Sequence, residues 1–69
     1  MNTFALDPNG TKWYRKNNLL HREDGPAVEY VNGDKEWYVD NKLHRLDGPA
    51  IEFADGRYEY WVNGRRQIQ

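Results

Sequence analysis

The residues of this chain best suited to chemistry are two histidines, each followed three positions later by an aspartate. His21 precedes Asp24, and His44 precedes Asp47. Imidazole nitrogens and carboxylate oxygens are common zinc ligands, so a single ion held by both pairs is the first hypothesis to consider. Each pair belongs to a longer segment that occurs twice, and this repetition decides what the four residues do.

The segment 20–30 is repeated at 43–53 without a gap, so that each position n of the first copy corresponds to position n + 23 of the second. Between residues 17–31 and 40–54, 9 of 15 positions are identical, and most of the others exchange similar side chains. The same step relates the dipeptides Asn9-Gly10, Asn32-Gly33 and Asp55-Gly56. The chain is therefore a repeat protein.

The repetition argues against a shared metal ion. Equivalent positions in stacked hairpins lie two strands apart, roughly 9–10 Å at about 4.8 Å per strand, whereas each ligand of a zinc ion lies about 2 Å from it. We expect no metal and no cofactor, and we expect each imidazole to hydrogen-bond to a turn or to the following aspartate of its own repeat. The structural corner predicted in this way comprises His21, Asp24, Gly25 and Pro26, and their copies His44, Asp47, Gly48 and Pro49.

An arginine follows each histidine, at positions 22 and 45. Two roles are open to Arg22 and Arg45. They can pair across strands with glutamates, the candidates being Glu29, Glu36, Glu52 and Glu59. Alternatively, they can form a basic row that binds carboxylates or phosphates of a partner.

The chain lacks the usual catalytic nucleophiles. It contains no cysteine and no serine, and its threonines, Thr3 and Thr11, lie near its start. Each glycine belongs to a short turn rather than to a strand-loop-helix unit, so none indicates a phosphate-binding loop. We predict that the protein is not an enzyme.

Length and composition limit the protein to one small domain. A chain of 69 residues buries only about 60% of the surface that it exposes when unfolded. The formal net charge is -1 and acids and bases are interspersed, which argues against nucleic-acid and anionic-membrane binding. Because there is no cysteine and no apolar run of about 20 residues, we expect a reducing, cytoplasmic location and no membrane contact.

Regularly spaced turn signals predict short strands. Gly, Asn and Asp tolerate the positive φ of hairpin turns, and they recur from residue 9 onward. The runs between them are short and rich in strand-forming residues. We predict an all-β fold, an antiparallel meander of six to eight short strands built from about two and a half 23-residue repeats. Residues 9–69 form this domain; residues 1–8 form a flexible lead-in, or an edge segment if Phe4 and Leu6 find a surface to pack on.

Aromatic residues fall in two neighbouring columns of the predicted sheet. At the spacing of the repeat, the first column holds Tyr14, Trp37 and Tyr60, and the second holds Arg15, Tyr38 and Trp61, on the opposite face. Either both sets pack in a strongly curved sheet, or one set is an exposed contact surface. For the second case the candidate contact residues are Trp13, Arg15, Tyr38, Trp61 and Arg65. Trp13 is one position out of register with Trp37, which predicts a β-bulge in the first repeat.

The repeat resembles a known family. Tyr58-x-Tyr60-Trp61-x-Asn63-Gly64-Arg65, together with the preceding Lys42-x-His44-x-x-x-Gly48 and Phe53-Ala54-Asp55-Gly56, is similar to the MORN repeat, a unit of the same period. The segment His-Arg-x-Asp-Gly-Pro-Ala looks like variant repeats of small phage and prophage proteins. The resemblance covers residues 9–69, and it implies one β-hairpin per repeat and a role in protein interaction or self-association. Arginine replaces the family's glycine after each histidine, so the membrane-junction roles ascribed to some MORN proteins are not carried over.

Three functions remain open. The first is a protein-binding module, most concretely a phage-encoded inhibitor of a bacterial defence or host protein, acting in the host cytoplasm. The second is a self-associating structural protein or ligand-sequestering sponge, a homodimer formed through an open sheet edge. The third, which the net charge disfavours, is a single-stranded nucleic-acid binder that stacks bases on its aromatic residues, with charge from Arg15, Lys16, Arg57, Arg65 and Arg66.

Overall fold

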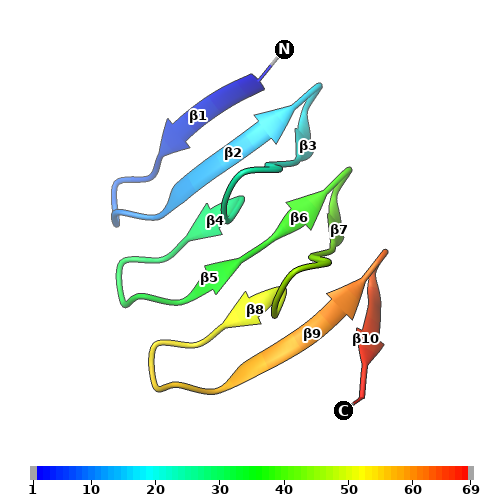
Figure 1. The fold of residues 1–69 in the computed structure, drawn as a ribbon. Helices are drawn as coiled ribbons and strands as arrows, with labels where there is room; N and C mark the ends of the chain where they lie inside the picture. The colour runs from blue at the N-terminus through cyan, green and yellow to red at the C-terminus, as the bar shows by residue number, and fades with distance from the viewer. Residues whose placement is uncertain (1, 69) are drawn as a thin grey trace.

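A computed structural model describes residues 2–68, and within that range it contains strands and turns but no helix (Figure 1). Ten short strands are present in this part of the chain: β1 (Asn2–Leu6), β2 (Lys12–Lys16), β3 (Leu19–Leu20), β4 (Val28–Glu29), β5 (Lys35–Glu36), β6 (Tyr38–Val39), β7 (Lys42–Leu43), β8 (Ile51–Glu52), β9 (Tyr58–Val62) and β10 (Arg65–Gln67). Every strand pair is antiparallel. The predicted all-β, antiparallel fold is confirmed. The described residues form ten strands rather than the six to eight predicted, because β1 is added and β5 and β6 are separate strands.

The strands form three equivalent hairpin units that stack on one another (Figure 1). Unit 1 contains β1–β3, unit 2 contains β4–β7 and unit 3 contains β8–β10. The register repeats with the sequence: Ala5 pairs with Trp13, Val28 with Glu36, and Ile51 with Glu59. The last strand of each unit folds back along one side of the sheet, at the right in Figure 1.

The first strand lies in the segment predicted to be a flexible lead-in. That prediction is corrected for residues 2–6, which pair along their full length with β2 as an edge strand; Met1 lies outside the described residues. The Phe4 ring packs against Tyr14, with 5.0 Å between centroids, so one of the two residues named for an edge segment does find a packing partner. By register, β1 is the counterpart of β4 and β8, which makes the array three units long rather than two and a half.

Two kinds of tight turn set the strand lengths. The first turn of each unit uses Gly10, Gly33 or Gly56, whose φ angles of 92 to 100° suit glycine. In the second turn both central residues have positive φ, as at Asp40 (50°) and Asn41 (69°), which is the geometry of a two-residue hairpin loop. Asparagine and aspartate, which tolerate this conformation, therefore mark the turns in the sequence.

The β-bulge predicted at Trp13 is absent. Lys12 pairs with Glu29 and Trp13 with Val28, and the next residue, Tyr14, donates its N–H to Ala27 O at 2.8 Å, so the register is unbroken. Trp13 occupies the position of Glu36 in unit 2. The apparent shift is a substitution within the repeat and not an insertion.

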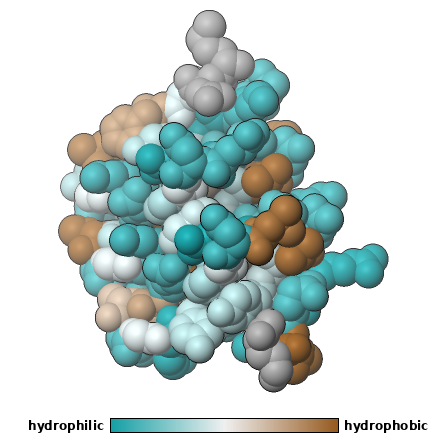
Figure 2. All heavy atoms as spheres, in the orientation of Figure 1, coloured by the Kyte–Doolittle hydropathy of each residue, from teal (hydrophilic) through white to brown (hydrophobic). Residues whose placement is uncertain are grey.

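The molecule is thin, with principal extents of 34, 26 and 16 Å. The buried apolar residues within the described range are Ala27, Val28, Ala50 and Ile51, all in the first strands of units 2 and 3 or next to them. The face seen in Figure 2 is mostly hydrophilic, with separate hydrophobic groups along its two sides. Within residues 2–68 there is no helix that could cross a membrane. Contacts between units, rather than a deep interior, hold this structure together.

Candidate functional site

The units are joined by two links, residues 21–27 and 44–50, and an arginine organises each of them. In the first link, Arg22 Nε donates to Asp24 Oδ1 at 3.0 Å. Its Nη1 donates to Pro26 O at 3.2 Å and to Glu29 Oε2 at 3.3 Å. The guanidinium also lies 4.0 Å from the centroid of the Tyr14 ring, a cation–π distance.

The second link repeats this arrangement. Arg45 donates to Asp47 Oδ1 at 3.1 Å, and to Pro49 O and Glu52 Oε2 at 3.0 Å each. Its guanidinium lies 4.0 Å from the centroid of the Trp37 ring. Two roles were left open for the arginines by the sequence. In the structure, Arg22 pairs with Glu29 and Arg45 pairs with Glu52.

The link glycines leave room for this stacking. A Cβ atom at Gly25 would lie 2.9 Å from Arg22 Cζ, and one at Gly48 would lie 2.9 Å from Arg45 Cζ. Both distances are shorter than carbon atoms tolerate, so any larger residue would displace the guanidinium. The arginine, and not the histidine, shapes the Asp-Gly-Pro corner.

The histidines bind the following unit, which corrects the expectation that they stay within their own repeat. His21 is buried, and its Nδ1 accepts a hydrogen bond from the Asp40 N–H at 3.1 Å. His44 Nδ1 accepts in the same way from the Asn63 N–H at 2.9 Å. Each donor is the first residue of a hairpin loop in the next unit. Within residues 2–68, no group of three His, Asp or Glu side chains is arranged to hold a metal ion.

The two histidines differ at their second nitrogen. His21 Nε2 lies 2.9 Å from Glu23 Oε2, whereas the position equivalent to Glu23 in the second link is Leu46. Because Nδ1 of His44 accepts a hydrogen bond, the hydrogen of its neutral ring is on Nε2. That N–H has no hydrogen-bond acceptor among the described residues. It is available to a ligand.

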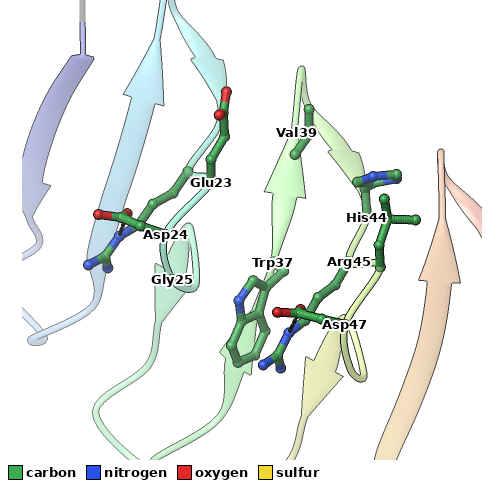
Figure 3. Close-up of a pocket in the computed structure, with 10 residues that line it drawn as sticks. Glu23, Asp24, Gly25, Trp37, Val39, His44, Arg45 and Asp47 are labelled. Carbon is green, nitrogen blue, oxygen red and sulfur yellow. Dashed lines mark hydrogen bonds and ion pairs between the residues drawn. The ribbon is translucent and has the colours of Figure 1, made fainter.

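A groove of about 720 Å³ lies between the two links, and His44 is one of its walls. The volume is in the range of ordinary ligand sites. Figure 3 shows Trp37, Arg45 and Asp47 together on one side of the groove, and Glu23 and Asp24 on the first link. The complete lining is Arg22, Glu23, Asp24, Gly25, Trp37, Val39, His44, Arg45, Leu46 and Asp47.

The charges of the groove are unequally exposed. Asp24 and Asp47 are each 88% exposed and Glu23 is 74% exposed, whereas the two arginines are largely covered. Leu46, at 80% exposed, stands among these carboxylates as an apolar side chain. The groove therefore presents an acidic rim beside an apolar surface.

The five residues predicted as contacts lie elsewhere. The polar atoms of the aromatic ones are used internally: Trp13 Nε1 donates to Asp7 at 2.8 Å, Tyr38 Oη to Glu36 at 3.1 Å and Trp61 Nε1 to Glu59 at 3.0 Å. Arg15 lies over Trp13, at 5.6 Å from the ring centroid, and Arg65 is exposed on β10. None of the five lines the groove.

Sequence reasoning did not select Trp37, Leu46 or the free nitrogen of His44 as a site. One signal was available, because position 46 is where the two copies of the link differ most, leucine against glutamate at Glu23. Glu23 contacts His21, and Leu46 in the second copy cannot make the equivalent contact. A position at which one copy of a repeat lacks the charge of the other is therefore a candidate for a different role. Comparison of the chain with protein-family models, curated proteins and solved structures finds no match, so a functional assignment depends on this geometry.

Proposed function

We propose that the protein is a non-catalytic binding module, and that the groove between its links receives an extended segment of a partner protein. The observation that carries the proposal is the fixed geometry of the groove walls. Arg22 and Arg45 are each held by three hydrogen bonds. A preorganised surface loses little conformational entropy when it binds.

The chemistry of the groove favours a segment with a basic side chain. The cation would meet the exposed carboxylates of Asp24 and Asp47, and its aliphatic stem would lie on Trp37 and Leu46. The Nε2–H of His44 would donate to a main-chain carbonyl of the same segment. An acidic rim disfavours nucleic acid as the occupant because phosphates would be repelled.

The resemblance of the links to phage and prophage repeats supplies the setting for this proposal. A small module of this kind would act as an inhibitor by occupying a bacterial defence or host protein in the host cytoplasm. The partner would then be a bacterial protein with a basic, extended segment at its functional surface.

Capture from a bacterial lysate on the immobilised protein tests the proposal. Leu46→Gln removes the apolar contact and gives His44 Nε2 an intramolecular acceptor without adding a charge to the groove. We expect the unaltered protein to retain one host protein in a fixed ratio, and this variant to lose at least about 90% of it, the effect of about 1.4 kcal/mol. Val31→Gln, at an exposed position outside the groove, is the matched control and should retain the partner. Equal capture on both variants, or no captured protein, would contradict the proposal.

A further inference from the structure

The interface between consecutive units is the same at both junctions inside the chain. At the first junction, the Tyr14 N–H donates to Ala27 O at 2.8 Å and the Arg22 N–H to Tyr38 O at 3.0 Å. At the second, the same bonds recur at the equivalent positions, from Trp37 to Ala50 at 2.7 Å and from Arg45 to Trp61 at 3.1 Å. The fold therefore contains two copies of one stacking contact, made each time between two different edges of the unit.

The two ends of the described array present the two halves of that contact. The outer edge of β1 corresponds to the edges by which β4 and β8 pair with the preceding unit. The outer edge of β9, with β10 beside it, corresponds to the edge by which unit 1 and unit 2 each pair with the following unit. If a second copy of the chain continued the array in the same register, the Tyr60 N–H of one copy would donate to Phe4 O of the other. The Phe4 ring packs against Tyr14, its cross-strand partner in β2.

Two residues, one at each end of the array, differ in a complementary way from the residues at the equivalent internal positions. Inside the chain, Arg22 and Arg45 pair with Glu29 and Glu52 across the junctions. Leu6 lies 23 residues before Glu29, so it occupies the position of the glutamates at one end of the array. Ile68 lies 23 residues after Arg45, so it occupies the position of the arginines at the other end. Leu6 is 62% and Ile68 93% exposed. At the ends of the array, apolar residues therefore occupy the positions of both members of the internal ion pair. The two replacements are complementary to each other only if Leu6 and Ile68 come into contact.

The apolar character extends along the same end surface. Tyr58 and Tyr60 of β9 stack edge to face with 5.6 Å between centroids, and Tyr58 is exposed. A shallow cavity of about 250 Å³ is lined by these two tyrosines and Ile68, with Glu59, Arg66 and Gln67. Arg22 covers Tyr14 inside the array, whereas Ile68 stands in the corresponding position beside Tyr60.

We infer that a second copy of the chain binds head to tail, with β1 of one copy against β9 of the other and Leu6 against Ile68 across the contact. The contact is heterologous, so it leaves one edge of each type open and permits longer stacks as the concentration rises. It differs from the dimer expected through a single open edge, in which each copy would offer the same strand. The groove between the links is not part of this contact, so the inference is independent of the proposed function.

Sedimentation equilibrium of the full chain over a range of concentrations tests the inference. The mass should rise with concentration for the unaltered protein. Leu6→Glu and Ile68→Arg should each weaken association at least about tenfold, because each would bury an unpaired charge in the contact. Val31→Glu, at an exposed apolar position away from both edges, should associate as the unaltered protein does. Circular dichroism verifies that every variant remains folded.

Complementation gives the decisive result. The double variant carrying Leu6→Glu and Ile68→Arg has the ion pair of the internal junctions and should recover association. An equimolar mixture of the two single variants should recover it as well, because each end of one then meets a matching end of the other. A monomer at all concentrations would overturn the inference. So would insensitivity to Ile68→Arg, which would indicate contact between two β1 edges, or failure of the mixture to associate.

Discussion

Tyr38 is a half-buried titratable side chain whose pKa is shifted strongly from its ordinary value. Its hydroxyl donates to Glu36 Oε1 at 3.1 Å. Burial, followed by the negative charge of Glu36 and the hydrogen bond to it, raises the pKa of Tyr38 to about 12. The same causes raise the pKa of Tyr30, which lies near the same glutamate. Ionisation of Tyr38 would remove its hydrogen bond and place two negative charges side by side.

This environment predicts a loss of stability at alkaline pH. The pKa of Tyr38 is about 12 in the folded state and about 10 in an unfolded chain. The folded state therefore favours the neutral phenol. Below about pH 10 both states are protonated and the stability is independent of this group. As the pH rises from about 10 to 12, the unfolded chain loses the proton first, and the stability falls.

Urea unfolding at about pH 9 and pH 11 tests this assignment. Tyr38→Phe should show a smaller pH dependence of the free energy of unfolding than the unaltered protein, because the group that titrates between the two states is gone. Tyr58→Phe, at an exposed position, is the control. An equal pH dependence in all three proteins would contradict the assignment.

At the scale of the element, the link depends on a planar cation. Arg45 holds an aspartate of its own link, a carbonyl of the same link and a glutamate of the next strand. Its flat guanidinium does this while lying over Trp37. A lysine ammonium is a point charge without a fixed fork of donors, so it cannot make these contacts in the same geometry.

Arg45→Lys should therefore destabilise the protein although the charge is kept. The loss of two charge-assisted hydrogen bonds and of the stacking contact is expected to lower the free energy of unfolding by about 1–2 kcal/mol. Urea denaturation measures the effect. Arg66→Lys, at an exposed arginine with a distant ion pair to Glu59 at 3.7 Å, should change the stability by less than about 0.5 kcal/mol. Equal stability of the two variants would show that charge alone maintains the link.

The sequence predicted the hairpins well and the link poorly. Turn residues report a local backbone angle, and the positive φ values at Asp40 and Asn41 are where such residues were expected. The roles of His21 and Arg22 depend instead on how far a side chain reaches between two units. Repetition identified both residues as structural. Spacing along the chain does not specify that Arg22 bonds to its own link and to Glu29 of the next strand, while His21 reaches the hairpin loop at Asp40.

For the whole molecule, the repeat period predicted the stacking but not its limits or the groove. β1 was missed as a repeat strand because Phe4 and Leu6 do not resemble Ala27 and Glu29, while strand pairing needs only the backbone and the register. The groove lies between two links and depends on how consecutive units are placed in space. A one-dimensional pattern indicates which positions are equivalent, and it does not indicate the shape left between them.

Because the buried apolar residues lie at the junctions of the units, we predict that the three units unfold in one cooperative transition. Isolated hairpins are marginally stable, and coupling between neighbouring repeats makes an array this short unfold as a whole.

The tryptophans allow a test, since Trp13 is in unit 1 and Trp61 is in unit 3. One variant would combine Trp37→Tyr with Trp61→Phe, and the other Trp37→Tyr with Trp13→Phe; tyrosine at position 37 reproduces the stacking partner found in the first link. In each variant, the urea midpoint from tryptophan fluorescence should coincide with the midpoint from circular dichroism, which reports all three units. Separate midpoints would show that the units unfold independently and that the links, despite their contacts, do not couple them.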